Sequence, residues 1–483
     1  MQLGGARARV AKLRYNKGHC STIAPCKPVK RSELARQGRR GPPPFFSMPQ
    51  GWYHQGMKLY LTTLGCRLNQ AEIESLAREA ASLGCQIVES PGEADWAVIN
   101  TCTVTHVAAR KSRQAIRRLR RGNPTLRVAV IGCYGEMAAD EARALGVDLV
   151  LPNAAKERLL DHLLDSAPLG APSPLAGPPP GGRTRAFVKV QDGCDNRCAY
   201  CIVTVARGPS RSRPPGEVLA DIQRRLGEGA QEVVLSGVNI GAYGQDRPGQ
   251  GPLPAGQGWG LARLVRQVLE STNVPRLRLS SIEPWDLTEE LLALWPHPRL
   301  CRQLHLPLQS GSDAVLRRMA RPMGVAAFRD LAAAARWRVP EMMLSTDLIV
   351  GFPGEGEDDF RETLRVAEEL ELARLHVFRY SPRAGTAAAR MDTPVPPDLA
   401  RQRSERLIAL GDELALAYHR RFVGQQVQVL FETPATLAGI PGWSGLTDHY
   451  LRVWAPGDGD LHNQLASVRC LEADVEGLRG ELA

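Results

Sequence analysis

The most constraining feature of this 483-residue chain is a series of six strand-like runs between residues 186 and 378, separated by helical patterns. Strands that alternate with helices in this way predict parallel βα units. Six units are fewer than the eight of a closed barrel, so we expect an incomplete, barrel-like sheet. The six runs are Ala186–Val190, Glu232–Leu235, Leu277–Ser280, Gln303–Leu306, Ser345–Val350 and Leu375–Phe378.

Strands and helices also alternate in the preceding part of the chain, over residues 57–166. Their apolar patterns predict a second α/β domain, with a parallel, flavodoxin-like sheet covered by helices. The expected strands are Lys58–Leu64, Trp96–Ile99 and Val128–Ile131, and the expected helices are Gln70–Leu83 and Val107–Arg121.

Residues 1–56 show no sustained helical or strand period and are rich in Arg, Gly and Pro, which predicts a disordered basic extension. They hold 11 Lys and Arg and a single acid, Glu33, whereas the rest of the chain has 50 basic and 50 acidic residues. One interpretation is that Met57 is the natural start; a transit peptide is the alternative, although the prolines disfavour an amphipathic helix. Because the formal excess of +10 lies in this segment, an argument for RNA binding must rest on local patches of the remainder.

Two composition changes divide the rest of the chain. Residues 167–184 are rich in Pro and Gly and predict an interdomain linker, so that the barrel-like domain covers residues 185–420. Short alternating runs, Gln426–Phe431 and Tyr450–Trp454, then predict a small β-rich domain over residues 421–483.

Eleven cysteines, an odd number, without an apolar signal-peptide core, indicate a reducing compartment and therefore a cytoplasmic location. No stretch approaches the roughly 18 apolar residues of a membrane helix, which disfavours an integral membrane protein. Cys85, Cys301 and Cys470 lie in apolar contexts and are expected to be core thiols. Cys20 and Cys26, in the basic extension, are assigned no role.

Cys194, Cys198 and Cys201 fall in one loop directly after the first strand of the barrel-like domain. Three thiolates on a short loop can bind three corners of a 4Fe-4S cluster, which leaves one iron open for a substrate or cofactor. A structural zinc site is the alternative, but it needs four ligands, and no further Cys or His follows until far downstream.

A second set, Cys66, Cys102 and Cys133, ends three predicted strands of the first domain, at separations of 36 and 31 residues. Parallel strands end at the same edge of a sheet, where such folds bind ligands. Buried structural thiols are the alternative for any single one of these cysteines. Three at the same topological position instead favour a second three-thiolate cluster with an open iron.

The C-x3-C-x2-C spacing, with Tyr200 before the last cysteine, resembles the radical S-adenosylmethionine (SAM) superfamily. The resemblance implies that SAM chelates the open iron and that the reduced cluster cleaves it to a 5′-deoxyadenosyl radical. It places Tyr200, Ser236, Gly237 and Glu283 as SAM contacts. One departure is that Thr204 and Val205 stand where the family usually carries Pro and an aromatic residue.

The two cysteine sets together resemble the methylthiotransferase family from about Met57 to the C-terminus. The phrases that carry the resemblance are Thr63–Gln70, Asn100–Val104, His305–Asp313 and Thr346–Gly354. Two further segments, Ser236–Gly244 and His376–Thr386, look like the MtaB-type branch, which modifies N6-threonylcarbamoyladenosine at tRNA position 37. In that branch the cluster of the first domain supplies the sulfur, one SAM methylates it, and a second yields the radical that takes hydrogen from C2 of the adenine.

The resemblance also implies partners. Gly445–Val453 is similar to the TRAM module, a small RNA-binding β-barrel, so we expect the chain to bind the anticodon stem-loop of tRNA as a monomer. A flavodoxin or ferredoxin would supply electrons. The arginines expected to grip phosphates, with a solvated surface as the alternative for each, are Arg207, Arg211, Arg213, Arg420 and Arg421.

Three alternatives stay open for the function. Sister branches of the family methylthiolate isopentenyladenosine in tRNA or an aspartate of a ribosomal protein. An alternative of another class is an iron-sulfur RNA-binding protein that lacks catalysis.

Overall fold

The computed structural model describes residues 56–165, 184–246 and 260–483. The predicted basic extension with Cys20 and Cys26 lies outside the described residues, as does the predicted linker up to residue 183. The described residues all belong to one compact unit, Tyr53–Ala483.

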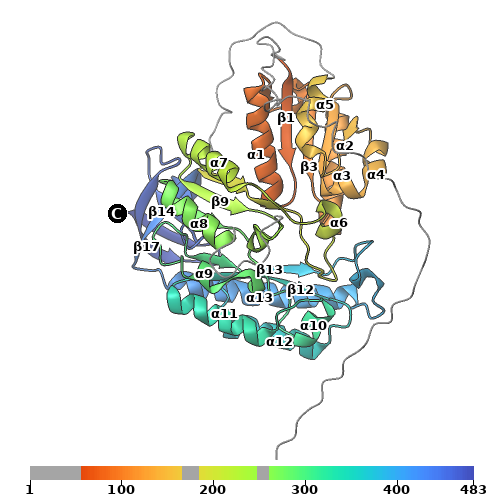
Figure 1. Ribbon diagram of the computed structural model, residues 1–483. Helices are drawn as coiled ribbons and strands as arrows, with labels where there is room; N and C mark the ends of the chain where they lie inside the picture. Colours follow the sequence, from red (N-terminus) through yellow and green to blue (C-terminus); the bar gives the residue numbers. More distant parts are fainter. Residues whose placement is uncertain (1–55, 166–183, 247–259) are drawn as a thin grey trace, which may run out of the picture. The chain divides into compact units, whose positions relative to one another are not determined.

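The first domain contains a five-stranded sheet in the order β2-β1-β3-β4-β5 (Figure 1). Every neighbouring pair is parallel, which confirms the prediction. The two short strands at its edges were not predicted, because runs of two or three residues carry no periodicity. The strands are β1 (Lys58–Thr63), β2 (Gln86–Val88), β3 (Trp96–Thr101), β4 (Arg127–Gly132) and β5 (Leu149–Val150).

Helices cover both faces of this sheet because the central strands are apolar on both sides. In β3, Val98 enters the core with α1 (Arg67–Ser82) and α5 (Leu159–Asp165). Its neighbours Ala97 and Ile99 enter the opposite core. The helices on that second face are α2 (His106–Gly122), α3 (Cys133–Met137) and α4 (Ala139–Ala144), and two 3-10 turns, η1 (Pro91–Glu93) and η2 (Lys156–Arg158), lie in the connections.

The six predicted βα units of the second domain are present as two three-stranded parallel sheets, β10-β9-β6 and β11-β12-β13. A parallel bridge between Leu277 and Leu300 and a hydrogen bond from Ile282 N to His305 O connect the two sheets. The strands are β6 (Arg185–Lys189), β9 (Glu232–Ser236), β10 (Arg276–Leu279), β11 (Gln303–His305), β12 (Met343–Val350) and β13 (Arg374–Arg379).

Helices follow these strands and pack on one face of the two sheets. A small antiparallel pair, β7 (Gln191–Asp192) and β8 (Arg211–Ser212), flanks the cysteine loop. The helices are α6 (Val203–Arg207), α7 (Pro215–Gly227), α8 (Leu261–Ser271), α9 (Glu289–Leu292), α10 (Asp313–Arg318), α11 (Val325–Arg338), α12 (Glu357–Glu369) and α13 (Pro397–Arg420), with 3-10 turns η3 (Ile240–Ala242), η4 (Pro284–Asp286) and η5 (Ala388–Arg390).

The C-terminal strands form a closed barrel in the order β14-β15-β16-β18-β17. Val429, Phe431, Val453 and Val468 fill its core. Closure leaves no unpaired strand edge, which a sheet of this size would otherwise expose. The strands are β14 (Gln426–Leu437), β15 (Ile440–Thr447), β16 (Arg452–Pro456), β17 (Leu465–Ala473) and β18 (Leu478–Leu482).

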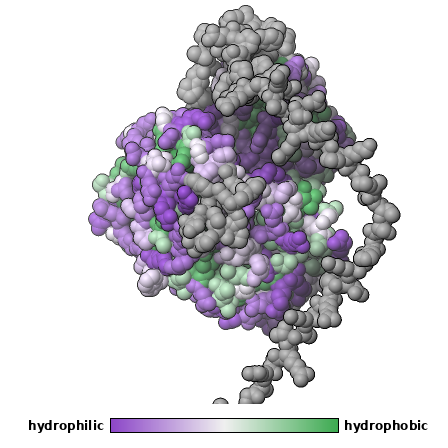
Figure 2. Space-filling model, viewed as in Figure 1, coloured by the Kyte–Doolittle hydropathy of each residue, from purple (hydrophilic) through white to green (hydrophobic). Residues whose placement is uncertain are grey.

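The hydropathy of the surface is that of a protein whose apolar residues lie mostly in the core. On the visible face of Figure 2, hydrophilic residues predominate and hydrophobic ones form small separate areas. Among the described helices, none is long and apolar enough to span a bilayer.

Candidate functional site

Cys194, Cys198 and Cys201 line one cavity of about 440 Å3. The loop turns back on itself at Gly193, where φ is +71° and an added Cβ would lie 1.9 Å from the carbonyl oxygen of Pro209. All three thiols are partly accessible. The remaining lining residues are Asp195, Asn196, Arg197, Ala199, Thr204, Val205, Gly208, Pro209, Gly385, Thr386 and Ala387.

The other three cysteines lie where the strands of the first sheet end, as predicted. Cys66 is the N-cap of α1, Cys102 follows β3, and Cys133 begins α3 directly after β4. The loops approach closely, because a Cβ on Gly65, where φ is +106°, would lie 3.0 Å from the Sγ atom of Cys102. Cys66 is exposed, whereas Cys102 and Cys133 are buried. The set is therefore open to its surroundings on the side of Cys66.

The donor chemistry of both sets fits a cluster better than a single ion. Within the described residues, no group of three His, Cys, Asp or Glu side chains is close enough to hold one metal ion. In a 4Fe-4S cluster each thiolate binds a different iron, so the sulfurs must stand further apart than around one ion. Burial raises the pKa of Cys102 to about 11 and that of Cys201 to about 12. Such thiols ionise at neutral pH only when a positive group such as iron compensates their charge.

Arg207 connects the two cysteine sets, since it ends the short helix that follows Cys201. Its side chain is buried and its Nη1 atom lies 2.9 Å from Oδ1 of Asp192 and 3.0 Å from Oε1 of Glu72. It also donates a hydrogen bond to Cys133, and this contact opposes the rise that burial causes in the pKa of that thiol. Arg207 therefore ties the loop of Cys194, Cys198 and Cys201 to Cys133, a ligand candidate of the other set.

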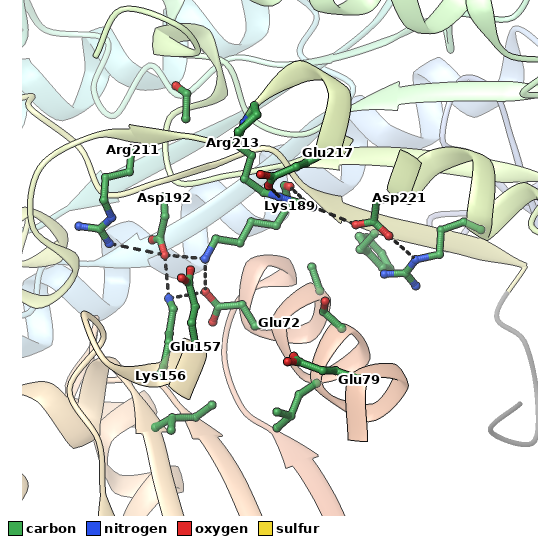
Figure 3. A pocket seen from close by; sticks show the side chains of 18 residues that line it. Glu72, Glu79, Lys156, Glu157, Lys189, Asp192, Arg211, Arg213, Glu217 and Asp221 are labelled. Atoms are coloured by element: carbon green, nitrogen blue, oxygen red, sulfur yellow. Dashed lines mark hydrogen bonds and ion pairs between the residues drawn. The ribbon is translucent and has the colours of Figure 1, made fainter. Parts of the chain in front are cut away.

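Two lysines complete this buried charge network, which borders a cavity of about 470 Å3 (Figure 3). Lys156 Nζ lies 2.6 Å from Glu72 and 2.7 Å from Asp192, and Lys189 Nζ lies 3.2 Å and 2.8 Å from the same two carboxylates. Burial opposes ionisation of Glu72 and Asp192, but the three cations outweigh it and hold both pKa values well below their usual range. The network is thus charged at neutral pH and carries one net positive charge.

The predicted SAM contacts lie near Cys194, Cys198 and Cys201 or at strand ends. Ser236 ends β9 and is buried. Gly237 follows it and has no room for a side chain, because an added Cβ would lie 3.0 Å from the carbonyl oxygen of Gln191. Glu283 precedes the turn η4, and burial raises its pKa although Arg321 lies 2.8 Å away. Tyr200 packs with Ala199 and other apolar residues. Their contact with SAM stays a prediction.

Arg321 was not singled out from the sequence, although it touches the same region. Its Nη1 atom lies 3.8 Å from Sγ of Cys198, and its guanidinium carbon lies 4.4 Å from the centre of the Trp285 ring. Its neighbours come from distant parts of the chain, so no sequence pattern marks it.

The arginines expected to grip phosphates differ in their surroundings. Arg207 is only 3% exposed, so the expectation that it lies on an RNA-binding surface needs correction. Arg213 is partly buried and bonds to Asp221, 3.1 Å away. Arg211 and Arg421 are nearly half exposed, and Arg420 is exposed as well. Those three remain candidates for phosphate contacts.

A polar group also lies on the face of β11, β12 and β13. His305 Nε2 is 3.2 Å from Oδ1 of Asp347, and the rings of His305 and His376 are 5.3 Å apart. Burial and then His305 lower the pKa of His376 to about 4, so this ring is neutral at pH 7. Sequence reasoning marked the segments that contain these histidines but not their side chains.

Two family models match the chain. Residues 58–151 match "Uncharacterized protein family UPF0004" and residues 188–367 match the "Radical SAM superfamily". Membership of that superfamily implies SAM and a 4Fe-4S cluster. Among solved structures, the radical SAM methyltransferase TsrM from Kitasatospora setae, with tryptophan and a SAM analogue, has a TM-score of 0.50 and 13% identity over 67% of this chain and 73% of its own. That likeness shows the fold.

Two curated relatives extend over most of the chain. The threonylcarbamoyladenosine tRNA methylthiotransferase MtaB of Thermotoga maritima is 34% identical over 434 residues, which are 86% of this chain and 95% of the relative. The tRNA-2-methylthio-N(6)-dimethylallyladenosine synthase of Thermus thermophilus is 35% identical over 82% of this chain and 87% of its own. The chain thus belongs to the radical SAM methylthiotransferase family and is of the MtaB type.

Proposed function

We propose that the protein methylthiolates C2 of N6-threonylcarbamoyladenosine at position 37 of tRNA, with SAM and two 4Fe-4S clusters. The observation that carries this proposal is the presence of two separate three-cysteine sets in one chain. Of the other cysteines among the described residues, Cys85 and Cys470 are buried in apolar cores, as predicted. Cys301 is also buried, but beside the ion pair of Arg278 and Glu232 rather than in an apolar core, which corrects that part of the prediction. Neither set therefore has an additional cysteine assigned to it.

When bound, these groups supply the sulfur and the one-electron chemistry that an unactivated C–H bond requires. The residues of the chain must then bind and orient the base. The polar face around His305, Asp347 and His376 offers donors and acceptors for this purpose. No side-chain acid or base has to remove the C2 proton.

The C-terminal barrel supports the tRNA part of the proposal. Small closed β-barrels bind single-stranded nucleic acid in many proteins. An anticodon loop presents partly unstacked bases, so an enzyme can reach its target without opening a duplex. Arg211, Arg420 and Arg421 are exposed cations that we assign to phosphate contacts, without sequence preference.

The domain boundaries are proposed as predicted, with residues 57–166, 185–420 and 421–483 as the three domains. The two family matches and the start of the barrel at Gln426 support them. We further propose a cytoplasmic monomer that receives electrons from a flavodoxin or ferredoxin.

A second candidate substrate is dimethylallyladenosine in tRNA, because the Thermus thermophilus relative that carries this name is 35% identical. The two substrates differ only in the group on N6, which is charged in one and apolar in the other. Relatives with both names have nearly equal identity to this chain, so the experiment compares the two substrates directly.

The test uses the full chain, reconstituted anaerobically and reduced with dithionite. It is mixed with SAM and with tRNA that carries either threonylcarbamoyladenosine or dimethylallyladenosine, and the digested nucleosides are analysed by mass spectrometry. We expect the methylthio derivative of the threonylcarbamoyl nucleoside alone. Product only from the dimethylallyl tRNA would move the protein to the sister branch. Absence of both products and of 5′-deoxyadenosine would favour a non-catalytic RNA-binding protein.

A further inference from the structure

The inner face of the first half of the barrel is formed by alternate residues of its strands. Val188 of β6 and Val233 of β9 enter the core with the covering helices. Their neighbours Phe187 and Val234 point the other way and pack on Ala71 of α1. Because side chains alternate along a strand, α1 lies against the inner face of this sheet.

Two cations on that same inner face are already paired with carboxylates. Arg278 Nε lies 2.6 Å from Oε1 of Glu232, and both side chains are fully buried. Arg185 Nε lies 2.6 Å from Oε1 of Glu432, which belongs to the C-terminal barrel. Each of these arginines thus has an anion to balance its charge.

Arg67, the first residue of α1 and the one after Cys66, differs from these two. It is exposed, and its guanidinium donates a hydrogen bond to the Tyr450 hydroxyl. The guanidinium carbon lies 5.0 Å from the centre of the Tyr450 ring and 5.9 Å from that of Phe187. Within the described residues, no carboxylate lies within salt-bridge distance of it. Arg67 is therefore an accessible cation that aromatic rings hold in place and no protein anion neutralises.

The pKa of the Tyr450 hydroxyl reflects the positive charges that surround it. Burial alone would raise the pKa of its hydroxyl, but Arg67, Arg185 and Arg278 lie so near that together they lower it. The residue also has a φ of 67°, which side chains other than glycine rarely adopt. Residues held in this way often mark a functional position, here one where an arginine cluster surrounds a phenol.

The charge of Arg67 also reaches the second half of the barrel. After burial, His305 and Arg374, it adds to the lowering of the pKa of His376 on β13. A substrate base bound beside this guanidinium would be near Cys66, which directly precedes Arg67 and is the exposed thiol of its set.

We propose that Arg67, supported by Tyr450, binds the carboxylate of the threonylcarbamoyl group and so selects this nucleoside over the dimethylallyl one. The proposal rests on the function proposed above, because only that substrate carries an anion on N6. An arginine binds a carboxylate through two parallel hydrogen bonds, which fixes orientation as well as position.

The chemistry of the base agrees with this placement. C2 and N6 flank N1 on the same edge of adenine, so a group that holds the N6 substituent must lie close to the sulfur that reaches C2. Arg67 and Cys66 are adjacent in the chain and meet this condition. An apolar dimethylallyl group would leave the guanidinium without an anion, and desolvating an unpaired charge is costly.

The test measures binding by the full chain of three anticodon stem-loops that differ only at position 37: threonylcarbamoyladenosine, dimethylallyladenosine or adenosine. Fluorescence anisotropy under anaerobic conditions gives each dissociation constant without turnover. We expect Arg67→Gln to weaken binding of the threonylcarbamoyl loop about 10-fold or more, which corresponds to one charged hydrogen-bonded contact, and to change the other two by less than about twofold. Arg67→Lys should retain part of the preference.

Tyr450→Phe, which changes a residue of the C-terminal barrel, provides a second variant in case Arg67→Gln loses iron. It should weaken only the threonylcarbamoyl loop, by a few-fold. Arg110→Gln, an exposed arginine on α2, is the matched control and should change none of the three constants.

The outcomes separate the inference from the function on which it rests. Equal weakening of all three loops by Arg67→Gln would make Arg67 a phosphate contact and overturn the inference. So would unchanged binding by both Arg67→Gln and Tyr450→Phe. If the unmodified protein instead methylthiolates only dimethylallyl tRNA, the proposed function itself has failed.

Discussion

The two three-cysteine sets are built in opposite ways. Cys194, Cys198 and Cys201 lie within eight residues of one loop, whereas Cys66, Cys102 and Cys133 span 68 residues. The geometry of Cys194, Cys198 and Cys201, the loop set, depends mainly on the backbone of its own loop and on Gly193. The geometry of Cys66, Cys102 and Cys133, the sheet set, depends on a sheet in which three strands must pair in the correct register.

This difference predicts different sensitivities. The loop set should persist when distant contacts are lost, because its turn is local. The sheet set should depend on tertiary contacts such as those of Arg207, which joins α6 to Cys133 and Glu72. The two sets should also contribute to different steps of one reaction, which mutation can separate.

The largest expected effect is the loss of all radical chemistry when Cys194, Cys198 and Cys201 are replaced together by alanine. Without these thiolates the iron that would bind SAM is not held, so no 5′-deoxyadenosine should form under dithionite. Liquid chromatography of the reaction measures this product. Formation of the nucleoside at the rate of the unmodified protein would contradict the assignment.

Replacement of Cys66, Cys102 and Cys133 by alanine should sharpen the contrast. SAM cleavage should continue, because the loop set is intact, but the methylthio nucleoside should disappear. Mass spectrometry of digested tRNA and assay of 5′-deoxyadenosine on the same sample separate the two readouts. If cleavage were lost as well, the two sets would not be independent sites.

These assignments show what the sequence could and could not predict. The loop set is visible as a local motif, and the sheet set is visible because strand ends of parallel sheets converge. The edge strands β2 and β5 were missed because they are too short to show a pattern.

The surroundings of the cysteines could not be predicted in the same way. The ion pairs of Lys156 with Glu72 and Asp192 join residues 84 and 36 positions apart. Arg207 looked like one more arginine of a basic loop, and only its 3% exposure shows that it is internal. Tertiary contacts, not local propensity, decide the role of such residues.

Arg207→Met would break the buried network, because Glu72 and Asp192 would lose one of their three cations. Removing one partner of a buried ion pair typically costs about 3–5 kcal/mol of unfolding free energy. Chemical denaturation should show this loss. When Arg207→Met is combined with each triple-alanine variant, iron should be lost first from the protein that retains only the sheet set and later from the one that retains only the loop set.

Arg211→Met is the matched control for that experiment. Arg211 is 47% exposed and approaches Asp192 only to 3.9 Å, so its loss should change the unfolding free energy by less than about 0.5 kcal/mol. Equal destabilisation by both variants would mean that the buried ion pairs of Arg207 contribute no more to stability than the exposed contact of Arg211.

The smallest expected effect concerns the surface. Arg211→Ala and Arg420→Ala should each weaken tRNA binding a few-fold, and each should reduce the slope of log affinity against log salt by about one. The loss should be the same for modified and unmodified anticodon loops, since phosphate contacts carry no sequence information. If the salt dependence of these two variants were unchanged, the tRNA phosphates would contact other residues of the protein.

The most direct test of the account is the iron and acid-labile sulfide content of the reconstituted protein and of its two triple-alanine variants. Two independent cubane sites predict about eight irons per chain in the unmodified protein and about four in each variant. About four irons in the unmodified protein, or loss of all iron from either variant, would contradict the central claim that each cysteine set holds its own cluster.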